Sequence, residues 1–152
     1  MQLDEKTYKE LDDIFKFDAN PLEKYKTPSK AREALDRWGK SNLLIPKDKI
    51  DKWFELAVEA LKKGKRVVVI NTFNPHYRYW FKNVWPWASK VVLYTQNKIV
   101  FKGYENPCPK TVAVVLFDPQ QRNSPRKNLI KDYVDGKYEY FSLPLKVKKS
   151  DV

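Results

Sequence analysis

Residues 48–71 read DKIDKWFELAVEALKKGKRVVVIN and contain the clearest helix signal and the clearest strand signal of the chain. Asp48 is a helix-capping residue type, and the segment Lys49–Lys63 that follows has one apolar face, formed by Ile50, Trp53, Phe54, Ala57, Val58 and Leu61. Gly64 ends the predicted helix, and the β-branched run Val67–Asn71 is typical of a buried strand. This succession predicts the helix–strand alternation of an α/β sheet.

Two further helices are predicted upstream of this stretch. Residues 3–16 place Leu3, Leu11, Ile14 and Phe15 roughly on one side of a helix. Thr27-Pro28 is a typical helix start, because threonine caps the first turn and proline favours the first helical position, and Gly39 ends that helix. The short apolar run Leu43–Ile45 then ends at Pro46.

Downstream, apolar runs alternate with turn residues. The predicted elements are a short helix over residues 76–85, strands at Lys90–Tyr94 and Thr111–Phe117, a basic polar loop at residues 120–128, and an edge strand at Tyr138–Val147. After Lys90–Tyr94 the sequence predicts either a second strand at Lys98–Phe101 or a tight return through Gln96-Asn97. Helices that alternate with apolar strands favour a single α/β domain over residues 1–152 with a largely parallel sheet. Strands crowded near the C-terminus favour a mixed sheet with an antiparallel element.

The composition excludes several classes of protein. The chain has 152 residues, of which 42% are hydrophobic and 14% aromatic, and this is too apolar for a disordered chain. The longest apolar runs are far too short for a membrane span, and the N-terminus has no apolar stretch typical of a signal peptide. The single cysteine, Cys108, excludes an internal disulfide framework and a multi-cysteine zinc site. We therefore expect an intracellular protein that binds no membrane.

The positive charge is concentrated in the second part of the chain. The net charge is +11, yet residues 1–60 carry 12 basic and 13 acidic side chains, whereas residues 61–152 carry 18 and 6. This asymmetry predicts that a polyanion, most simply a nucleic acid, binds to one surface. The alternative is a lysine-rich surface that serves solubility.

Residues 71–87 (NTFNPHYRYWFKNVWPW) interleave seven aromatic side chains with cations. Aromatic faces stack bases while nearby cations hold phosphates, so this segment is predicted to bind nucleic acid. The predicted nucleic-acid contacts, here and elsewhere in the basic part, are Arg66, Arg78, Tyr79, Lys82, Trp87, Arg122, Arg126 and Lys127. The alternative is that Phe73, Trp80, Phe81 and Trp85 form core, which leaves Tyr77, Tyr79 or Trp87 partly exposed.

Within this segment, Asn74-Pro75-His76-Tyr77 follows the strand Val67–Asn71. Amino-methyltransferases use a motif of the type Asp/Asn/Ser-Pro-Pro-Tyr/Phe after a strand. Its polar residue and first proline carbonyl accept hydrogens of the target amine, and its aromatic ring stacks on the base. Asn74, Pro75 and Tyr77 are therefore the candidate catalytic residues, with His76 in place of the second proline. The alternative is a turn that begins a helix.

A longer pattern runs from about residue 15 to residue 118. Its segments are Phe17–Pro21, Leu35–Gly39, Asp51–Trp53, Gly64 with Val67–Ile70, Trp80-Phe81, Asn97–Gly103 and Thr111–Phe117. In order and spacing they resemble the phage- and virus-type Dam family of DNA N6-adenine methyltransferases. The resemblance implies a Rossmann-like, methyltransferase-type domain with a mixed sheet flanked by helices, and residues 120–152 then form a basic C-terminal extension.

The chain departs from that family at the catalytic motif. Where the family has Asn-Pro-Pro-Tyr, this chain reads Ile45-Pro46-Lys47-Asp48. An apolar Ile45 cannot accept a hydrogen bond from adenine, and no aromatic ring follows to stack on the base. The cofactor turn keeps Asp18 but lacks the nearby glycine.

The resemblance implies a DNA-binding protein that uses S-adenosylmethionine, if active, to methylate adenine N6, with Asp18 as the cofactor contact. The degenerate motif predicts weakened or lost catalysis, so a non-catalytic viral nucleic-acid-binding protein is the first alternative. The second alternative is a small metal-dependent nuclease that uses Asp118 or Glu105. No metal site is expected otherwise, because the lone histidine, His76, has no second histidine or cysteine beside it in a ligand pattern.

Overall fold

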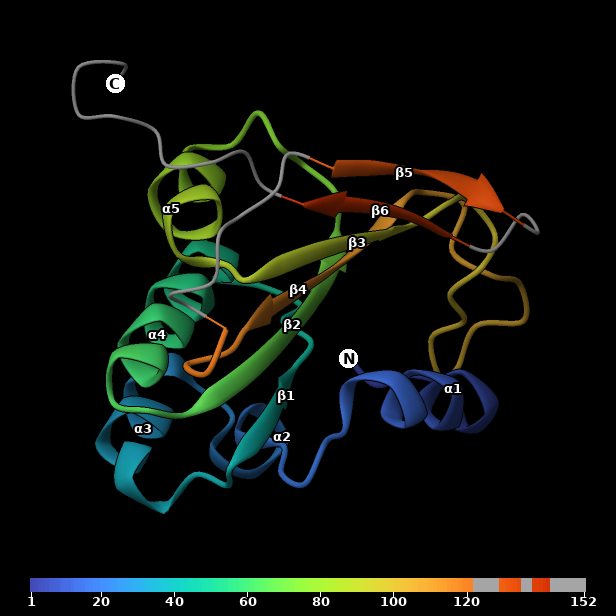
Figure 1. The fold of residues 1–152 in the computed structure, drawn as a ribbon. Coiled ribbons are helices and arrows are strands. Elements are labelled where there is room, and N and C mark those ends of the chain that lie inside the picture. The colour runs from blue at the N-terminus through green and yellow to red at the C-terminus, as the bar shows by residue number, and fades with distance from the viewer. Residues whose placement is uncertain (122–128, 135–137, 143–152) are drawn as a thin grey trace.

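One mixed sheet organises the computed structural model, which describes residues 1–121, 129–134 and 138–142 (Figure 1). The strands are β1 (Ser41–Leu44), β2 (Arg66–Thr72), β3 (Lys90–Tyr94), β4 (Val112–Phe117), β5 (Leu129–Val134) and β6 (Tyr138–Ser142), in the order β1-β2-β4-β3-β6-β5. The helices are α1 (Glu5–Phe15), α2 (Pro21–Tyr25), α3 (Pro28–Glu33), α4 (Ile50–Lys62) and α5 (Trp85–Trp87), with a 3₁₀ turn at Leu35–Arg37 and a π-helical turn at Trp80–Val84. The α/β class and the mixed sheet predicted from the sequence are confirmed.

The predicted largely parallel sheet is wrong. Strands β1 and β2 pair in parallel, joined by the α4 crossover, but every other pairing between the named strands is antiparallel. Strand β4 lies between β2 and β3 and runs against both, so β1, β2 and β3 still point in one direction. The physical reason is the connection at residues 95–111, which contains no helix and returns the chain antiparallel to β3.

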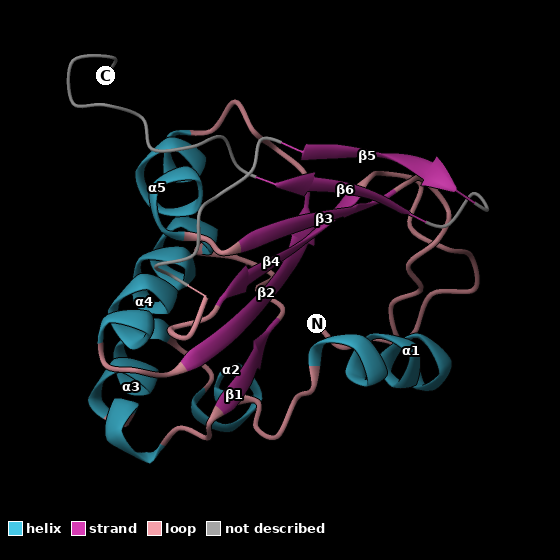
Figure 2. Ribbon diagram, in the orientation of Figure 1, coloured by secondary structure: helices cyan, strands magenta, loops and turns pink. Residues whose placement is uncertain are grey.

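The two faces of the sheet bury different side chains of the same strands. In β2, Val67 and Val69 belong to one core cluster with α4, while Val68 and Ile70 belong to a second cluster with α1. Figure 2 shows α3, α4 and α5 on one side of the sheet and α1 on the other. Because successive strand residues point to opposite faces, a continuous apolar run such as that of β2 requires cover on both sides.

Helix α4 forms where the sequence pattern predicts it. Its buried face contains Trp53, Phe54, Leu56, Ala57, Val58, Ala60 and Leu61. The predicted cap at Asp48 is wrong, because the N-cap is Lys49, in a left-handed conformation with φ 51° and without a side-chain cap. The predicted cap at Thr27 is confirmed, since its hydroxyl accepts a hydrogen bond from the Lys30 N–H at 3.3 Å.

Of the two alternatives predicted after β3, the tight return through Gln96-Asn97 is correct and the strand at Lys98–Phe101 is wrong. Phe101 instead makes an isolated bridge with Leu3 of the N-terminal segment. The short helix predicted over residues 76–85 forms over residues 78–87, and its middle part, which begins at the fully buried Trp80, is π-helical rather than α-helical. The predicted edge strand at Tyr138–Val147 corresponds to β6, while residues 143–147 and most of the loop at 120–128 lie outside the described residues. No helix in the described part of the chain could span a bilayer.

Replacing Phe54 with alanine should strongly destabilise the fold. This side chain has no exposed surface and its ring contacts those of Tyr79, Trp80 and Phe117 at centroid distances of 5.1, 6.0 and 6.4 Å. Phe54→Ala should lower the free energy of unfolding by about 3–5 kcal/mol, because it removes buried area and leaves a cavity. Urea denaturation measures this loss. The control Ile14→Ala, at a side chain that is 58% exposed, should change stability by less than about 0.5 kcal/mol.

Candidate functional site

Two adjoining clefts lie on the α1 side of the sheet, at the carboxyl end of β1. The first, here called the edge cleft, has a volume of about 720 Å³, and the second, the α1 cleft, has about 670 Å³. They share Ile45, Phe101, Tyr104 and Glu105. Ligands of open α/β sheets bind outside the carboxyl ends of the strands, so this edge is where the fold itself favours a site.

The edge cleft lies between the ends of β1 and β2. Its lining includes Pro46 after β1 and Asn71 and Thr72 at the end of β2, facing the loop at residues 97–110. Asn71 is buried, and its amide Nδ2 donates a hydrogen bond to the Pro46 carbonyl at 3.3 Å. The Thr72 hydroxyl donates to Asn71 Oδ1, also at 3.3 Å. The polar groups of Pro46, Asn71 and Thr72 in the cleft lining therefore bind mainly to one another.

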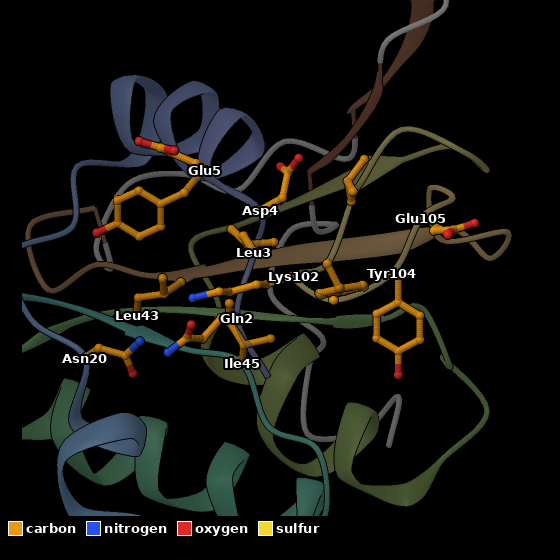
Figure 3. Close-up of a pocket in the computed structure, with 14 residues that line it drawn as sticks. Gln2, Leu3, Asp4, Glu5, Asn20, Leu43, Ile45, Lys102, Tyr104 and Glu105 are labelled. Carbon is orange, nitrogen blue, oxygen red and sulfur yellow. The ribbon is translucent and has the colours of Figure 1, made fainter.

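The α1 cleft is acidic at its rim. Figure 3 shows Asp4 and Glu5 at the start of α1, and Tyr104 and Glu105 at the opposite side of the cleft. Asp4 caps α1, and hydrogen bonds from the side chain and the backbone N–H of Thr7 lower its pKa. Tyr8 also lines this cleft, and burial raises the pKa of its phenol, with the nearby Asp12 carboxylate adding to the shift.

The predicted catalytic residues directly follow β2. Asn74 is held in place by its own amide, whose Nδ2 donates to the Thr72 carbonyl at 3.2 Å and to the Thr72 hydroxyl at 2.8 Å. Asn74 and Pro75 are partly exposed and Tyr77 is 50% exposed, and none of the three lines either cleft. The chain turns here toward the α4 side of the sheet, away from the clefts.

Four rings form what we call the aromatic column on that side. Phe54 of α4 stacks on Tyr79 with centroids 5.1 Å apart, and Tyr79 lies nearly parallel to Tyr77 at 5.7 Å and 12°. His76 contacts Tyr77 at 4.4 Å with its ring tilted by 33°. Tyr79 is half-buried, and this burial raises the pKa of its phenol. Tyr77 and His76 are exposed. The column therefore extends from the core to the surface.

The cations predicted in this segment lie beside the column. Arg78 and Lys82 are exposed, and Lys82 Nζ is 3.7 Å from a Glu55 carboxylate oxygen. Trp87 is half-buried, and Lys62 Nζ lies 4.5 Å from its ring centroid, a cation–π geometry. The structure thus groups most of the predicted nucleic-acid contacts that it describes into one region.

Phe81 is the surface aromatic that the sequence pattern did not identify. It was assigned to the core as an alternative, yet it is 63% exposed, while Trp80 beside it is fully buried. No local signal separates it from Trp80, because the two side chains are adjacent and similarly apolar.

Arg66 lies at the amino end of β2, which is the opposite end of this strand from the edge cleft. Its guanidinium donates to the carbonyls of Phe15 and Lys16 and to the Ser41 hydroxyl, the last at 2.6 Å. It also pairs with the Asp118 carboxylate at 3.5 Å. These contacts join the end of α1 to β1, β2 and β4, so the side chain predicted to bind phosphates serves the fold. The other predicted contacts Arg122, Arg126 and Lys127 lie outside the described residues.

Asp18 is separated from the predicted catalytic residues. Its Oδ1 accepts a hydrogen bond from the Ser41 N–H at 3.1 Å, at the amino end of β1, and it lines neither cleft. A Cβ added to Gly39 would come within 2.3 Å of that oxygen, so the glycine allows the carboxylate to approach the backbone. Asn74 follows the carboxyl end of β2, so the structure does not bring Asp18 and Asn74 together.

The two acids considered for a nuclease also lie apart. Asp118 follows β4 at the edge where β2 begins and is paired with Arg66, whereas Glu105 lies at the clefts. Among the residues that the structure describes, no cluster of three or more His, Cys, Asp or Glu side chains could hold a metal ion.

Comparisons with known protein families, with curated proteins and with solved structures found no match for this chain.

Gly39→Ala should reveal whether Asp18 is a structural residue. The new methyl group would collide with the Asp18 carboxylate and come within 2.9 Å of the Ala19 side chain. We expect a loss of about 1–3 kcal/mol in the free energy of unfolding. The double variant Asp18→Ala/Gly39→Ala should cost less than the sum of the single variants, since one collision is removed. Strictly additive losses in thermal or urea denaturation would contradict this placement.

Proposed function

We propose that this chain is a nucleic-acid-binding domain, with DNA as the favoured partner, built on a methyltransferase-type sheet whose catalysis is lost. The observation that carries the proposal is the surface formed by Tyr77, Arg78, Phe81 and Lys82, in which two exposed rings alternate with two exposed cations. Phosphates are held by cations and bases are stacked by aromatic rings, so this combination suits a nucleic acid better than an uncharged partner.

The charge distribution supports the same partner. Residues 61–121 carry ten basic side chains and two acidic ones, Glu105 and Asp118. Asp118 is buried and paired with Arg66, so it contributes little negative charge to the surface. A positive surface of this kind attracts polyanions and accelerates their association.

The strand directions support the methyltransferase-type sheet. Strands β1, β2 and β3 point one way with β4 reversed among them, which fits the mixed sheet that the resemblance implies. Ala19 makes a parallel bridge with Asn42, so the cofactor turn at Asp18 lies beside β1, the strand that pairs with β2.

Two contacts support the loss of catalysis. Pro46 is the one proline that remains at the family's motif position, and its carbonyl already accepts a hydrogen bond from Asn71. Asn74 begins the motif-like tetrapeptide at residues 74–77 that follows β2. Its side-chain amide donates hydrogen bonds to Thr72, and it lies outside the edge cleft. An adenine amine would therefore have to displace contacts within the protein.

A catalytic methyltransferase is the second candidate, favoured by the edge cleft at the carboxyl ends of β1 and β2. Bound S-adenosylmethionine would supply the methyl group, Asn74 and Pro75 would accept the hydrogens of the adenine amine, and Tyr77 would stack on the base. Our first proposal predicts no change in Tm at millimolar S-adenosylmethionine. A clear rise in Tm would favour this second candidate, because a ligand that binds only the native state stabilises it.

Salt dependence tests the proposed function directly. Affinity for a labelled DNA should fall linearly on a log–log plot against salt, with a slope of about 0.9 for each phosphate contact on duplex DNA. Arg78→Ala should reduce the magnitude of that slope by about 1 and weaken binding at low salt. The matched control is Arg37→Ala, at an exposed arginine near the amino end of β1, and it should leave the slope unchanged. No salt-sensitive binding to any DNA would overturn the proposal.

A further inference from the structure

We propose that the partner is single-stranded, and that its bases stack on a platform formed by the exposed end of the aromatic column and Phe81. This inference rests on the proposed function and names the form of nucleic acid that the same surface takes. It follows from the rings rather than from the charge, since cations bind the phosphates of single and double strands alike.

The aromatic column is a preformed stack. The Phe54 ring is fully buried, the Tyr79 ring is half-buried, and the Tyr77 ring is 50% exposed. The successive rings from Phe54 to Tyr77 are nearly parallel, at 18° and 12°, and the tilted His76 ring beside Tyr77 leaves half of the Tyr77 side chain exposed. A base that stacks on this end extends an existing stack, and the rings lose little conformational freedom on binding because the core already holds them.

Phe81 provides a second ring on the same segment. Trp80, fully buried, anchors the segment through ring contacts with Phe73 at 5.2 Å and Trp85 at 5.1 Å. The chain on either side of this anchor exposes Tyr77 and Phe81, which are 50% and 63% exposed. Arg78 and Lys82 are both exposed and each follow one of these rings in sequence, and Lys82 Nζ lies 3.7 Å from a Glu55 carboxylate oxygen.

Duplex DNA has few accessible base faces that could stack on this platform. Within a duplex both faces of each base are covered by its stacked neighbours, whereas a single strand can turn individual bases onto aromatic side chains. The protein also provides an internal comparison in Tyr104, which is as exposed as Phe81 but lies at the clefts beside Glu105. None of the platform side chains lines these clefts, so Tyr104 lies outside the platform and should not take part.

Fluorescence anisotropy with labelled oligothymidine and with a duplex of equal length tests the inference. The full-length chain should bind the single strand more tightly at the same salt concentration. Tyr77→Ala and Phe81→Ala should each raise the Kd for the single strand by about 5- to 150-fold, the range expected for the loss of one stacked base. Both should change the Kd for the duplex far less. Tyr77→Phe should keep single-strand binding, because it retains the ring, and the matched control Tyr104→Ala should leave both affinities unchanged.

The outcomes separate the two proposals. Salt-sensitive binding to both forms of DNA with equal affinity, unaffected by Tyr77→Ala and Phe81→Ala, would overturn the single-strand inference and leave the proposed function intact. Absence of salt-sensitive binding to either form would overturn both. Circular dichroism and Tm of each variant show whether it folds, and a loss of binding in a variant with the parent's Tm supports the platform.

Discussion

The fold depends on the pairing of β2 with β4. Six residues of each strand pair antiparallel, from Val67 with Phe117 to Thr72 with Val112, while β1 pairs along the other edge of β2. Strand β2 is therefore hydrogen-bonded on both sides and apolar on both faces. A strand in that position satisfies its backbone polar groups only inside a sheet, and it obliges the chain to cover both faces with other elements.

That constraint also determines where the candidate site lies. The chain leaves β2 at Thr72 and must cross to β3, which is not a neighbour of β2 because β4 occupies the place between them. The crossing segment contains the buried Trp80 and the exposed Tyr77 and Phe81. One segment thus closes the α4 side of the core and presents aromatic rings to solvent. The proposed binding surface is a consequence of how the sheet is connected, and it needs no separate recognition domain.

The site could be predicted in part. The position of residues 74–82 after a buried strand, and the mixture of rings and cations there, are properties of the sequence, and the exposure of Tyr77 agrees with the prediction made from it. The exposure of Phe81 and the structural use of Arg66 could not be read in this way. Phe81 and Trp80 are adjacent and similarly apolar, and only the three-dimensional neighbours of each decide which is buried. Arg66 binds carbonyls some 50 residues away in the chain.

The sequence by itself determined the α/β class, the strands β2, β3 and β4, helix α4, and the concentration of positive charge after residue 60, because periodicity, capping and charge are local properties. The tertiary structure alone decided that β4 lies reversed between β2 and β3, that Asp18 and Asn74 lie at different edges of the sheet, and that the rings form a column. The reason is that a buried β-branched run can pair in either direction. Its partner is chosen by contacts between segments that are distant in the chain.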